Sequence, residues 1–424
     1  MKFIELTEEE FSIYTNSHPM TSFHQTVEWG KLKEKNGWKY YIVGVKENDN
    51  IIAASLILEK KLFLNYNLAY APRGFLIDYG NVDLLTFFTD NLKKMLKKRK
   101  TIFVKIDPYA IHLERDINGN IIENGIDNSN YTNNLIKLGY NHTGYNKGQE
   151  NLQPRWAMAL SLKDKSVEDI YQNMEQKTRQ LINKNERNGL RTREISIDEL
   201  DIFKKIMTHT SERRNFIDRP FEYYKNMLIT MKDKAKVVIC EINLKEFIQK
   251  MNNEVDLNNK EIKQKQDAIK NGENINVKKT QKKIEELEKT NEKLLEKINL
   301  YENKMAEDGE LIALGGIIFM IHGKEVLSLF GGAYSKYMEL LSPYTTNYEM
   351  IKYAINNGYE KYNFYGIDGH YDDKKSELYG LYDFKRGFGG VVEEYIGEFN
   401  LILSKPLYMM YQVALKIYKG MKRK

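Results

Sequence analysis

Short apolar runs alternate with amphipathic stretches over most of the chain, and this pattern predicts a mixed α/β fold. Runs dense in β-branched and aromatic residues predict strands, for example at 39–47, 101–108 and 155–162. Stretches with apolar residues three or four positions apart predict helices, the clearest at 166–189 and 198–214. The alternation recurs in two blocks of comparable length, which indicates two related α/β domains.

Residues 244–305 depart from this pattern. They are polar, and their apolar positions recur with heptad spacing in two runs that flank 271-NGENINV-277, whose Asn-Gly pair is a turn signal. We therefore expect an antiparallel coiled-coil helical hairpin with arms of about 22 residues, or roughly 33 Å each. Residues 242–308 contain 14 lysines and 14 acidic residues. Such a balanced charge favours a solvated spacer or a protein contact, with tRNA contact as the alternative.

Composition agrees with a globular protein of two or three domains, because hydrophobic residues make up 42% of the 424 positions. The one cysteine, Cys240, lies in an apolar run, so we expect it buried in a strand, without an internal disulfide and in a reducing compartment. The N-terminus lacks a signal peptide's apolar core, and the longest apolar run, 311–321, is too short to span a bilayer. We expect a soluble cytoplasmic protein.

The net charge of +6 is concentrated at the C-terminus. No acidic residue follows Glu398, whereas six cations do: Lys405, Lys416, Lys419, Lys422, Arg423 and Lys424. The apolar residues among them have mostly helical spacing. A basic amphipathic helix of this kind predicts contact with an anionic membrane surface or with RNA, and a solubilising terminal helix is the alternative.

Several catalytic signatures are absent from the sequence. It contains no GxxxxGK[ST] loop, no HExxH and no CxxC, so neither a phosphate-binding loop of that type nor a metal site is expected. The seven histidines are scattered, and we interpret His209 and His370 as structural. With its cysteine expected to be buried, thiol catalysis is not expected either.

What remains is a set of cations beside aromatic or acidic residues. They occur in 25-QTVEWGKLKEKNGW-38, 69-AYAPRGF-75, 104-VKIDP-108, 211-SERRNFIDRPFEYY-224 and 380-GLYDFKRGFGG-390. Arginine binds phosphate through two parallel hydrogen bonds, so a phosphate-bearing ligand suits the fourth segment. Asp107, at the end of an apolar strand, is placed for acid–base work, although Asp-Pro is also a common strand stop. Solvent-facing lysines and a hairpin turn are the alternatives for the first two segments.

Nine segments in order resemble the Fem family (FemA, FemB and FemX type) of peptidoglycan-bridge aminoacyltransferases, over essentially the whole chain. They are 24-HQTVEWGKLK-33, 70-YAPRGF-75, 106-IDP-108, 153-QPRWAM-158, 218-DRPFEYY-224, 344-YTTNYEMIKYA-354, 363-NFYGIDG-369, 381-LYDFKRGFGG-390 and 395-YIGEFN-400. The predicted hairpin resembles the arm of members that act on lipid-linked precursor.

The resemblance implies two GNAT-like acyltransferase domains with the hairpin inserted. The expected boundaries are 1–152 plus 398–424 for the first domain, 153–242 plus 309–397 for the second, and 243–308 for the arm. The implied reaction transfers glycine, or else alanine or serine, from aminoacyl-tRNA to an amine of the stem peptide. The segment 395–400 and the basic end favour a FemX-like enzyme, a lipid II:glycine glycyltransferase that adds the first bridge residue.

The resemblance also assigns site residues. Lys33 and Arg219 match residues that hold the precursor's phosphates, with Tyr223 beside them. Phe384 and Lys385 match a pair near the reacting ester, and Asp107 matches an aspartate at the floor of the cleft. We expect 381–390 to be extended, with Phe384 and Lys385 facing the cleft, Arg386 facing away, and the glycines turning the chain into a strand.

Two positions depart from the family members that use a soluble nucleotide. Ile102 and Phe330 stand where tyrosines occur there. Neither side chain has a hydroxyl, so no hydrogen bond to the substrate is expected from these places.

The chemistry of the implied reaction agrees with the residue types found in these segments. Aminoacyl-tRNA is an activated ester, so its aminolysis needs positioning and oxyanion stabilisation rather than a covalent enzyme intermediate. The expected partners are aminoacyl-tRNA as co-substrate, lipid II or a UDP-MurNAc-pentapeptide-type precursor, and the inner face of the plasma membrane through the basic tail. No cofactor is expected, and a homodimer is left open.

Two other functions are weighed. An acyl-CoA-dependent N-acyltransferase of the same fold would need a [QR]xxGx[GA] loop that opens a helix, and the near match 386-RGFGGV-391 fails at its last position. A non-catalytic coiled-coil adaptor would have no need of the cation–aromatic segments outside the arm.

Overall fold

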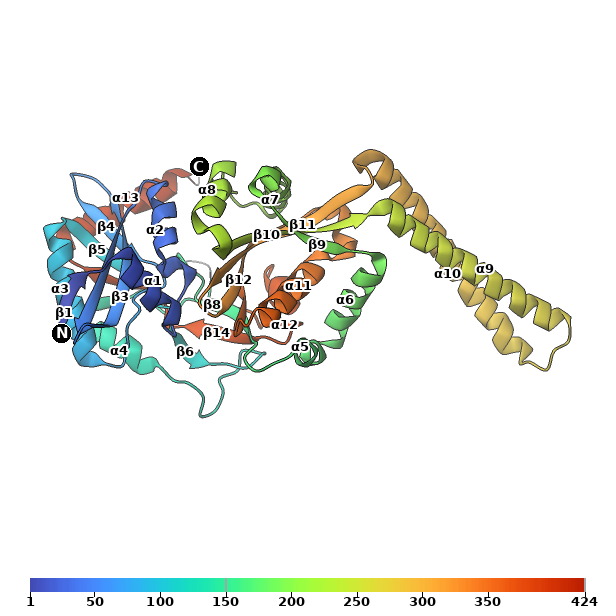
Figure 1. Cartoon of the computed structure of the whole chain (residues 1–424), viewed down its shortest axis with the longest axis horizontal. Helices are drawn as coiled ribbons and strands as arrows, with labels where there is room; N and C mark the ends of the chain where they lie inside the picture. Colours follow the sequence, from blue (N-terminus) through green and yellow to red (C-terminus); the bar gives the residue numbers. More distant parts are fainter. Residues whose placement is uncertain (149–150, 423–424) are drawn as a thin grey trace.

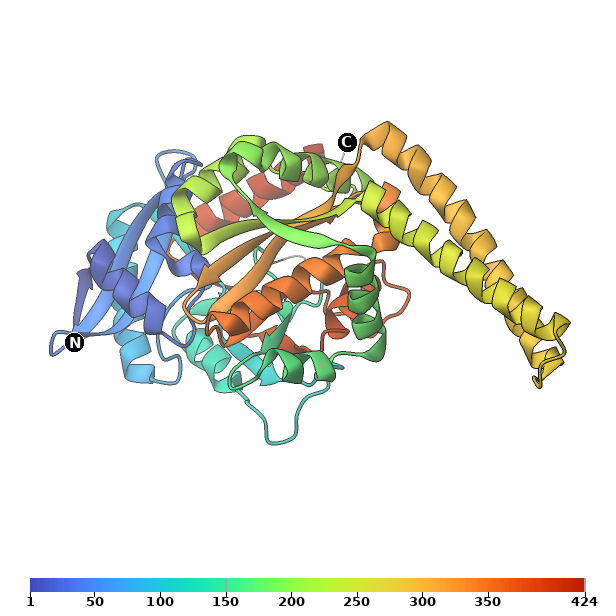
Figure 2. The same cartoon turned by 45° about the vertical axis from the view of Figure 1, so that its right-hand side comes forward.

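The computed structural model describes residues 1–148 and 151–422, with the side chains of 418–422 left aside. The last cations of the predicted basic tail, Lys419, Lys422, Arg423 and Lys424, therefore lie outside the described side chains. Two β-sheets form the body of the molecule, and a long helical hairpin projects from one end (Figures 1 and 2).

The first half of the chain builds most of one sheet. Its elements are β1 (Lys2–Glu5), α1 (Glu8–Ser17), α2 (Val27–Glu34), β2 (Lys39–Glu47), β3 (Asn50–Lys61), β4 (Asn67–Ala71), α3 (Val82–Lys98), β5 (Thr101–Ile106), β6 (Ile111–Glu114), α4 (Ser129–Lys137) and β7 (Tyr140–His142).

The second half supplies the other sheet, the arm and the C-terminal helix. Its elements are β8 (Trp156–Ser161), α5 (Val167–Asn173), α6 (Gln176–Asn188), β9 (Arg191–Ile195), α7 (Leu200–Arg214), α8 (Phe221–Met231), β10 (Ala235–Asn243), α9 (Leu244–Lys270), α10 (Val277–Asp308), β11 (Leu311–His322), β12 (Glu325–Ala333), α11 (Ser342–Asn356), β13 (Lys361–Gly366), α12 (Tyr379–Arg386), β14 (Val391–Tyr395), β15 (Phe399–Ile402) and α13 (Lys405–Lys422).

The two sheets repeat one plan. In the first, β1 to β4 pair antiparallel in sequence order, and β4 then pairs with β5 in parallel. In the second, β9 to β12 pair antiparallel and β12 pairs with β13 in parallel. Two helices follow the first strand of each set, and one helix precedes each parallel strand, since a parallel connection needs a crossover. The fold is thus α/β, with two GNAT-like domains related by duplication.

Each sheet also receives one strand from elsewhere in the chain. The C-terminal strand β15 pairs with β5 and β7 in the first sheet. Strand β6 follows β5 in sequence but pairs with β14 in the second sheet. These two exchanges join the halves, so the region between them is built by both.

The arm occupies the β10–β11 connection, which corresponds to the tight β2–β3 turn of the first half. The predicted antiparallel hairpin is present, and Gly272, at φ +66°, stands in its turn. Its helices have 27 and 32 residues, about 40 and 48 Å, rather than the expected 22, because their inner turns pack on the second domain. The apolar seam between the helices includes Val255, Ile262 and Leu287.

The predicted helix over 166–189 is wrong in one respect. Met174, at ψ 152°, ends α5, and α6 begins at Gln176. The break lets the backbone N–H of Glu175 donate to the carbonyl of Gly387, 2.9 Å away. Gly189 then ends α6 at φ 88°, as the glycine predicted. Cys240 is fully buried in β10, also as predicted.

The C-terminal helix α13 lies against the first sheet. The rings of Tyr408 and Tyr411 pack on Phe103, with centroids 5.0 and 5.2 Å away. The opposite side of the helix exposes Met409, Met410, Val413 and Ile417. Among the described residues, none of the helices combines the length and the apolar character needed to cross a bilayer.

Candidate functional site

Lys33 and Arg219 meet at the ring of Tyr223, although α2 and α8 belong to different halves of the chain. The Nζ atom of Lys33 lies 5.8 Å from the ring centroid, and the guanidinium carbon of Arg219 lies 5.4 Å from it. Neither cation forms an ion pair with an acidic side chain in the described part of the chain. Two cations held together without a counter-ion form a site for an anion.

Local sequence explains how these side chains are placed. The hydroxyl of Thr26 accepts a hydrogen bond from the backbone N–H of Trp29 at 3.2 Å and starts α2. Trp29 and Lys33 are then one helical turn apart, and the ammonium lies 4.2 Å from the indole centroid. Pro220 similarly precedes α8, so that Arg219 and Tyr223 stand at its start.

The environment of Lys33 changes its ionisation. Burial, followed by repulsion from Arg219 and Lys60, lowers the pKa of Lys33 to about 8. An anionic ligand between the two cations would reverse this effect, because it stabilises the protonated ammonium. The pair would therefore gain charge stabilisation from a bound anion.

Asp107 directly follows β5, as expected, and is 3% exposed. Its two carboxylate oxygens accept hydrogen bonds from the Tyr70 hydroxyl and from the backbone N–H of Arg73, both at 2.6 Å. Burial raises the pKa of Asp107 to about 6, against the opposing charge of Arg73. These contacts fix the turn at 71–74, so the geometry favours a positioning role over that of a general base.

The turn presents Arg73, at φ 54°, to the junction between the sheets. Its guanidinium donates to the carbonyl of Pro154 at 2.9 Å and lies 4.7 Å from the ring of Tyr395 and 5.2 Å from that of Tyr109. For this segment the sequence predicted either a turn that presents the Arg73 guanidinium to a ligand or a plain hairpin turn. The structure does not present the guanidinium to a ligand, because it is buried, 3% exposed, and donates to the carbonyl of Pro154.

Lys385 lies on a helix and not on an extended segment, so the predicted conformation of 381–390 is wrong. Tyr379–Arg386 forms α12, and the glycines that follow lead into β14 as expected. Arg386 does not point away by strand alternation; it pairs with Glu175 at 3.0 Å and with Asp383 at 3.3 Å. The run of aromatic residues at helical spacing could have indicated a helix.

The side chain of Lys385 is 6% exposed and donates hydrogen bonds to two backbone carbonyls, those of Gly366 at 2.7 Å and Tyr365 at 3.3 Å. Burial alone lowers the pKa of Lys385 to about 7. Phe384, one residue before it, packs edge-to-face on Tyr344 with centroids 4.8 Å apart. A lysine that is half protonated near neutral pH can donate or accept a proton.

Tyr365 lies between these groups and was missed in the sequence. Its carbonyl accepts from Lys385, and its hydroxyl donates to Gln153 at 2.6 Å. Burial raises the pKa of Tyr365 to about 12; the nearby Arg73 opposes this rise, whereas Asp107 and Tyr223 add to it. Its positive φ of 64° is not visible in the sequence. Tyr365 thus lies near Lys385, Asp107 and Tyr223, and the Tyr223 ring is in turn near Lys33 and Arg219. Phe384 packs among aromatic residues of the second domain instead.

The remaining candidates have local partners. The ring of His209 hydrogen-bonds Ser335 at 2.9 Å, and that of His370 hydrogen-bonds Asp368 at 2.8 Å, in agreement with structural roles. Within 1–148 and 151–422, no group of His, Cys, Asp and Glu side chains is arranged to hold a metal ion.

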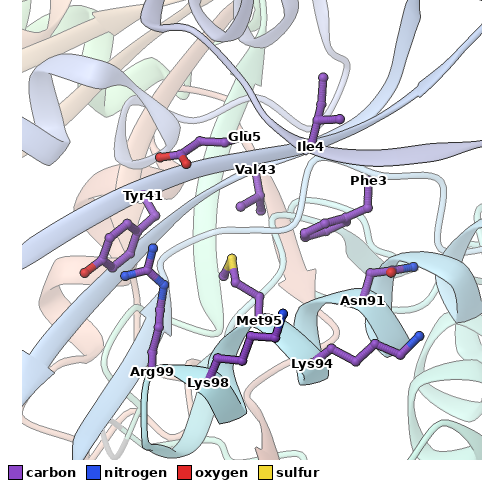
Figure 3. Close-up of a pocket in the computed structure, with 10 residues that line it drawn as sticks. All are labelled: Phe3, Ile4, Glu5, Tyr41, Val43, Asn91, Lys94, Met95, Lys98 and Arg99. Atoms are coloured by element: carbon purple, nitrogen blue, oxygen red, sulfur yellow. The ribbon is translucent and has the colours of Figure 1, made fainter.

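A separate pocket lies between β1, β2 and α3, as Figure 3 shows. Its lining includes Lys94, Lys98 and Arg99 together with Glu5 and apolar side chains. The Arg99 guanidinium stacks on Tyr41, with its carbon 3.5 Å from the ring centroid. None of the six candidate residues lines this pocket, so it is not part of the site.

The duplicated GNAT-like fold, in which cations from both halves meet at one aromatic ring, is that of an acyltransferase-like protein. The model of the FemAB family matches residues 6–416. Aminoacyltransferase FemA of Staphylococcus aureus strain bovine RF122 / ET3-1 is 34% identical over 420 residues, which cover 98% of this chain and 99% of the relative. The same figures hold for FemA of strain NCTC 8325.

A crystal structure of FemX is similar, with a TM-score of 0.76 and 28% identity, over 97% of this chain and 99% of that chain. Its similarity extends over both halves and the arm. The chain belongs to the FemAB family.

Proposed function

We propose that this protein transfers an amino acid from aminoacyl-tRNA to an amine of the stem peptide of lipid II, and so builds the interpeptide bridge of peptidoglycan. Membership of the FemAB family and the name aminoacyltransferase carried by its FemA relatives support this reaction class. The amino acid we propose is glycine. The proposed reaction needs no cofactor, and the charged tRNA is its co-substrate.

The observation that carries the proposal is the convergence of Lys33 and Arg219 on Tyr223. Guanidinium and ammonium groups bind phosphate oxygens through charge-assisted hydrogen bonds. A pyrophosphate-linked precursor places two adjacent phosphates where two adjacent cations are needed. Tyr223 supplies a ring on which both cations rest, which holds them in place before the ligand arrives.

The chemical step is assigned to the region around Lys385. The amine nitrogen of the stem peptide attacks the ester carbonyl, a C–N bond forms, and the bond to the ribose oxygen breaks. The proton lost by the amine must reach that leaving oxygen. Lys385 is suited to stabilise the oxyanion and to donate a proton, since its pKa of about 7 lets both forms exist at neutral pH.

Phe384 and Asp107 are given supporting roles. Phe384 packs on Tyr344 and fixes the orientation of α12 beside the ester. Asp107 holds the turn that carries Arg73, through the hydrogen bond to the Arg73 backbone. The acyl-CoA alternative has no structural support here, because 386–391 closes α12 and leads into β14 instead of opening a helix.

The decisive experiment offers lipid II together with Gly-, Ala- or Ser-tRNA and reads the products by mass. The expected result is addition of one glycine from Gly-tRNA. The control offers acetyl-CoA as the acyl donor. Transfer from acetyl-CoA with none from any charged tRNA would overturn the proposal.

A further inference from the structure

Three of the most exposed large apolar side chains of the described residues belong to segments that are linked through neighbouring residues. They are Ile217, 90% exposed, Leu64, 73% exposed, and Met409, 68% exposed. Ile217 belongs to the α7–α8 loop, Leu64 to the β3–β4 turn, and Met409 to the outer side of α13. Apolar side chains gathered on one face mark a surface that meets a partner or a membrane.

Contacts of neighbouring residues link these three segments. The β3–β4 turn is followed by Asn67, which hydrogen-bonds the carbonyls of Arg99 and Lys100 at 2.8 and 3.0 Å. The strand that starts there holds α13, because the carbonyl of Ile102 accepts from Leu403 at 2.9 Å. On the other side, the charge of Lys60 acts on Lys33, which adjoins Arg219 of the α7–α8 loop. In both views, α13, α7 and α8 run along the upper edge (Figures 1 and 2).

Tight turns set the backbone at these tips, but the apolar side chains at the tips pack on little of the protein. Leu64 adopts φ 50°, a conformation that glycine or asparagine adopts at lower cost, yet its side chain touches little of the protein. Asn215, at φ 53°, ends α7 and turns the chain outward. Phe216, 45% exposed, and Ile217 follow this turn at once. The loop therefore exposes apolar side chains that do not pack into the core of the protein.

Positive charge surrounds the tips. Arg213 and Arg214 flank the α7–α8 loop and, in the described chain, have no ion-pair partner, while Asp218 is paired with Lys204. Glu212 and Glu222 are exposed on the flanking helices, so the excess charge comes from neighbouring elements. These supply Lys60 and Lys61 of β3, Lys100 beside Asn67, and Lys405 and Lys416 of α13.

We infer that this surface, formed by the α7–α8 loop, the β3–β4 turn and the outer side of α13, docks on an anionic lipid bilayer with Ile217 inserted among the lipids. Apolar tips ringed by cations fit such a surface, since the tips enter the interface and the cations bind the headgroups. RNA would bind the cations through its phosphates, but it would make no favourable contact with the exposed apolar tips. The surface adjoins Lys33 and Arg219, so docking would bring a lipid-linked pyrophosphate to these cations.

This inference rests on the proposed function in one respect, that a lipid-linked precursor is the reason for docking. The test of docking itself needs no catalysis. Cys240 is fully buried, so a cysteine introduced by Ile217→Cys is the accessible thiol of the described chain. An environment-sensitive fluorophore attached there should brighten and shift to the blue with vesicles of phosphatidylcholine and phosphatidylglycerol, about 3:1. The matched control, Leu257→Cys, lies on the arm at 64% exposure and should not respond.

A second pair of variants measures the affinity. Ile217→Asp should lower the vesicle-bound fraction in cosedimentation by at least about tenfold in partition coefficient, since it replaces an inserted apolar group by a charge of the lipid's own sign. Leu257→Asp should leave it unchanged. An unchanged partition for Ile217→Asp, or a fluorophore at 217 that responds to tRNA and not to vesicles, overturns the inference.

Activity separates this inference from the proposed function. Ile217→Asp should keep its turnover of a water-soluble, nucleotide-linked precursor and lose it on vesicle-borne lipid II. Equal losses on both substrates would place Ile217 in the site and overturn the docking role. If the wild-type chain transfers nothing to either substrate while vesicle docking persists, the proposed function fails and the docking surface stands.

Discussion

Lys33 and Arg219 approach the same ring from opposite halves of a duplicated fold. Their charged groups lie 5.8 and 5.4 Å from the centroid of Tyr223. Lys33 stands on α2 and Arg219 just before α8, and these two helices pack against each other. Because α2 and α8 hold equivalent positions in the two repeats, the site lies where the duplication brings the two halves face to face. Neither half alone would form it.

The first prediction concerns Arg219. Arg219→Ala should raise the apparent KM for the precursor by about tenfold or more with little change in kcat, since one charge-assisted hydrogen bond contributes about 1.5–3 kcal/mol. Steady-state kinetics with varied precursor concentration measure this. Arg191→Ala, which removes an exposed arginine of β9, is the matched control and should leave KM unchanged. An unchanged KM in Arg219→Ala would remove the phosphate role.

The second prediction concerns pH. Lys33 has a pKa of about 8, so its charge is present below that pH and is lost above it. Affinity for an anionic precursor should therefore fall as the pH rises through about 8. Lys33→Arg should remove this fall, because arginine stays charged. Arg219→Ala should move the inflection to higher pH, although burial, the larger cause, keeps it below the value of a free lysine. Identical KM profiles for wild type and Lys33→Arg would contradict the assignment.

The third prediction concerns the activity of Lys385. Lys385→Ala should abolish transfer of a labelled amino acid from charged tRNA to lipid II, while circular dichroism stays native. Lys385→Met keeps the length of the side chain without its proton and should be equally inactive. Near-normal turnover in either variant would sink the catalytic assignment.

The stability of Lys385 variants has a predictable sign. Burial lowers the folded pKa to about 7, so between pH 7 and the higher pKa of the unfolded chain the unfolded state binds the extra proton. Stability should then rise with pH over that window, by at most about 1.4 kcal/mol per unit. Lys385→Met should flatten this rise and exceed wild type most at or below pH 7. Urea unfolding at pH 6.5 and 9 tests it, and parallel curves for the two proteins would refute it.

The sequence predicted the parts of the fold that depend on local pattern. The strands around 39–47 and 101–106, the hairpin at 244–308 and the glycine stop at 189 follow from apolar period, turn residues and backbone freedom. The break at Met174 and the helix α12 were not predicted. The break depends on a contact distant in sequence, the carbonyl of Gly387 that accepts from Glu175. The helix α12 carried a local signal, its aromatic spacing, that was not used.

The site shows the same division. Lys33, Arg219 and Tyr223 could be chosen from the sequence, because cations beside an aromatic residue suit an anionic ligand. The fold brings them together. The burial of Lys385 and Arg73 and the place of Tyr365 between them follow from how the two sheets meet. No spacing in the sequence reports that meeting, because it depends on strands exchanged between the halves.

The last prediction concerns the arm, which consists of two apolar parts separated by a polar layer. In that layer Asn291 hydrogen-bonds Asn258 at 2.8 Å and Asn259 at 2.9 Å. The inner part shares a core with the second domain, whereas the outer part is a small separate cluster around Ile262, Ile284 and Leu287. Removing the outer part should therefore leave the domain folded.

Replacing residues 260–290 by a short glycine-rich turn should leave the melting temperature within a few degrees of wild type. The matched control replaces 245–308, which removes the inner part and with it Phe247 and Tyr301 of the shared core, and should fail to fold. In the shorter deletion the KM for aminoacyl-tRNA should stay at its wild-type value, because the arm's balanced charge suits a spacer or a protein contact better than a polyanion. A severalfold rise in that KM, with the precursor KM unchanged, would show that the outer arm binds tRNA.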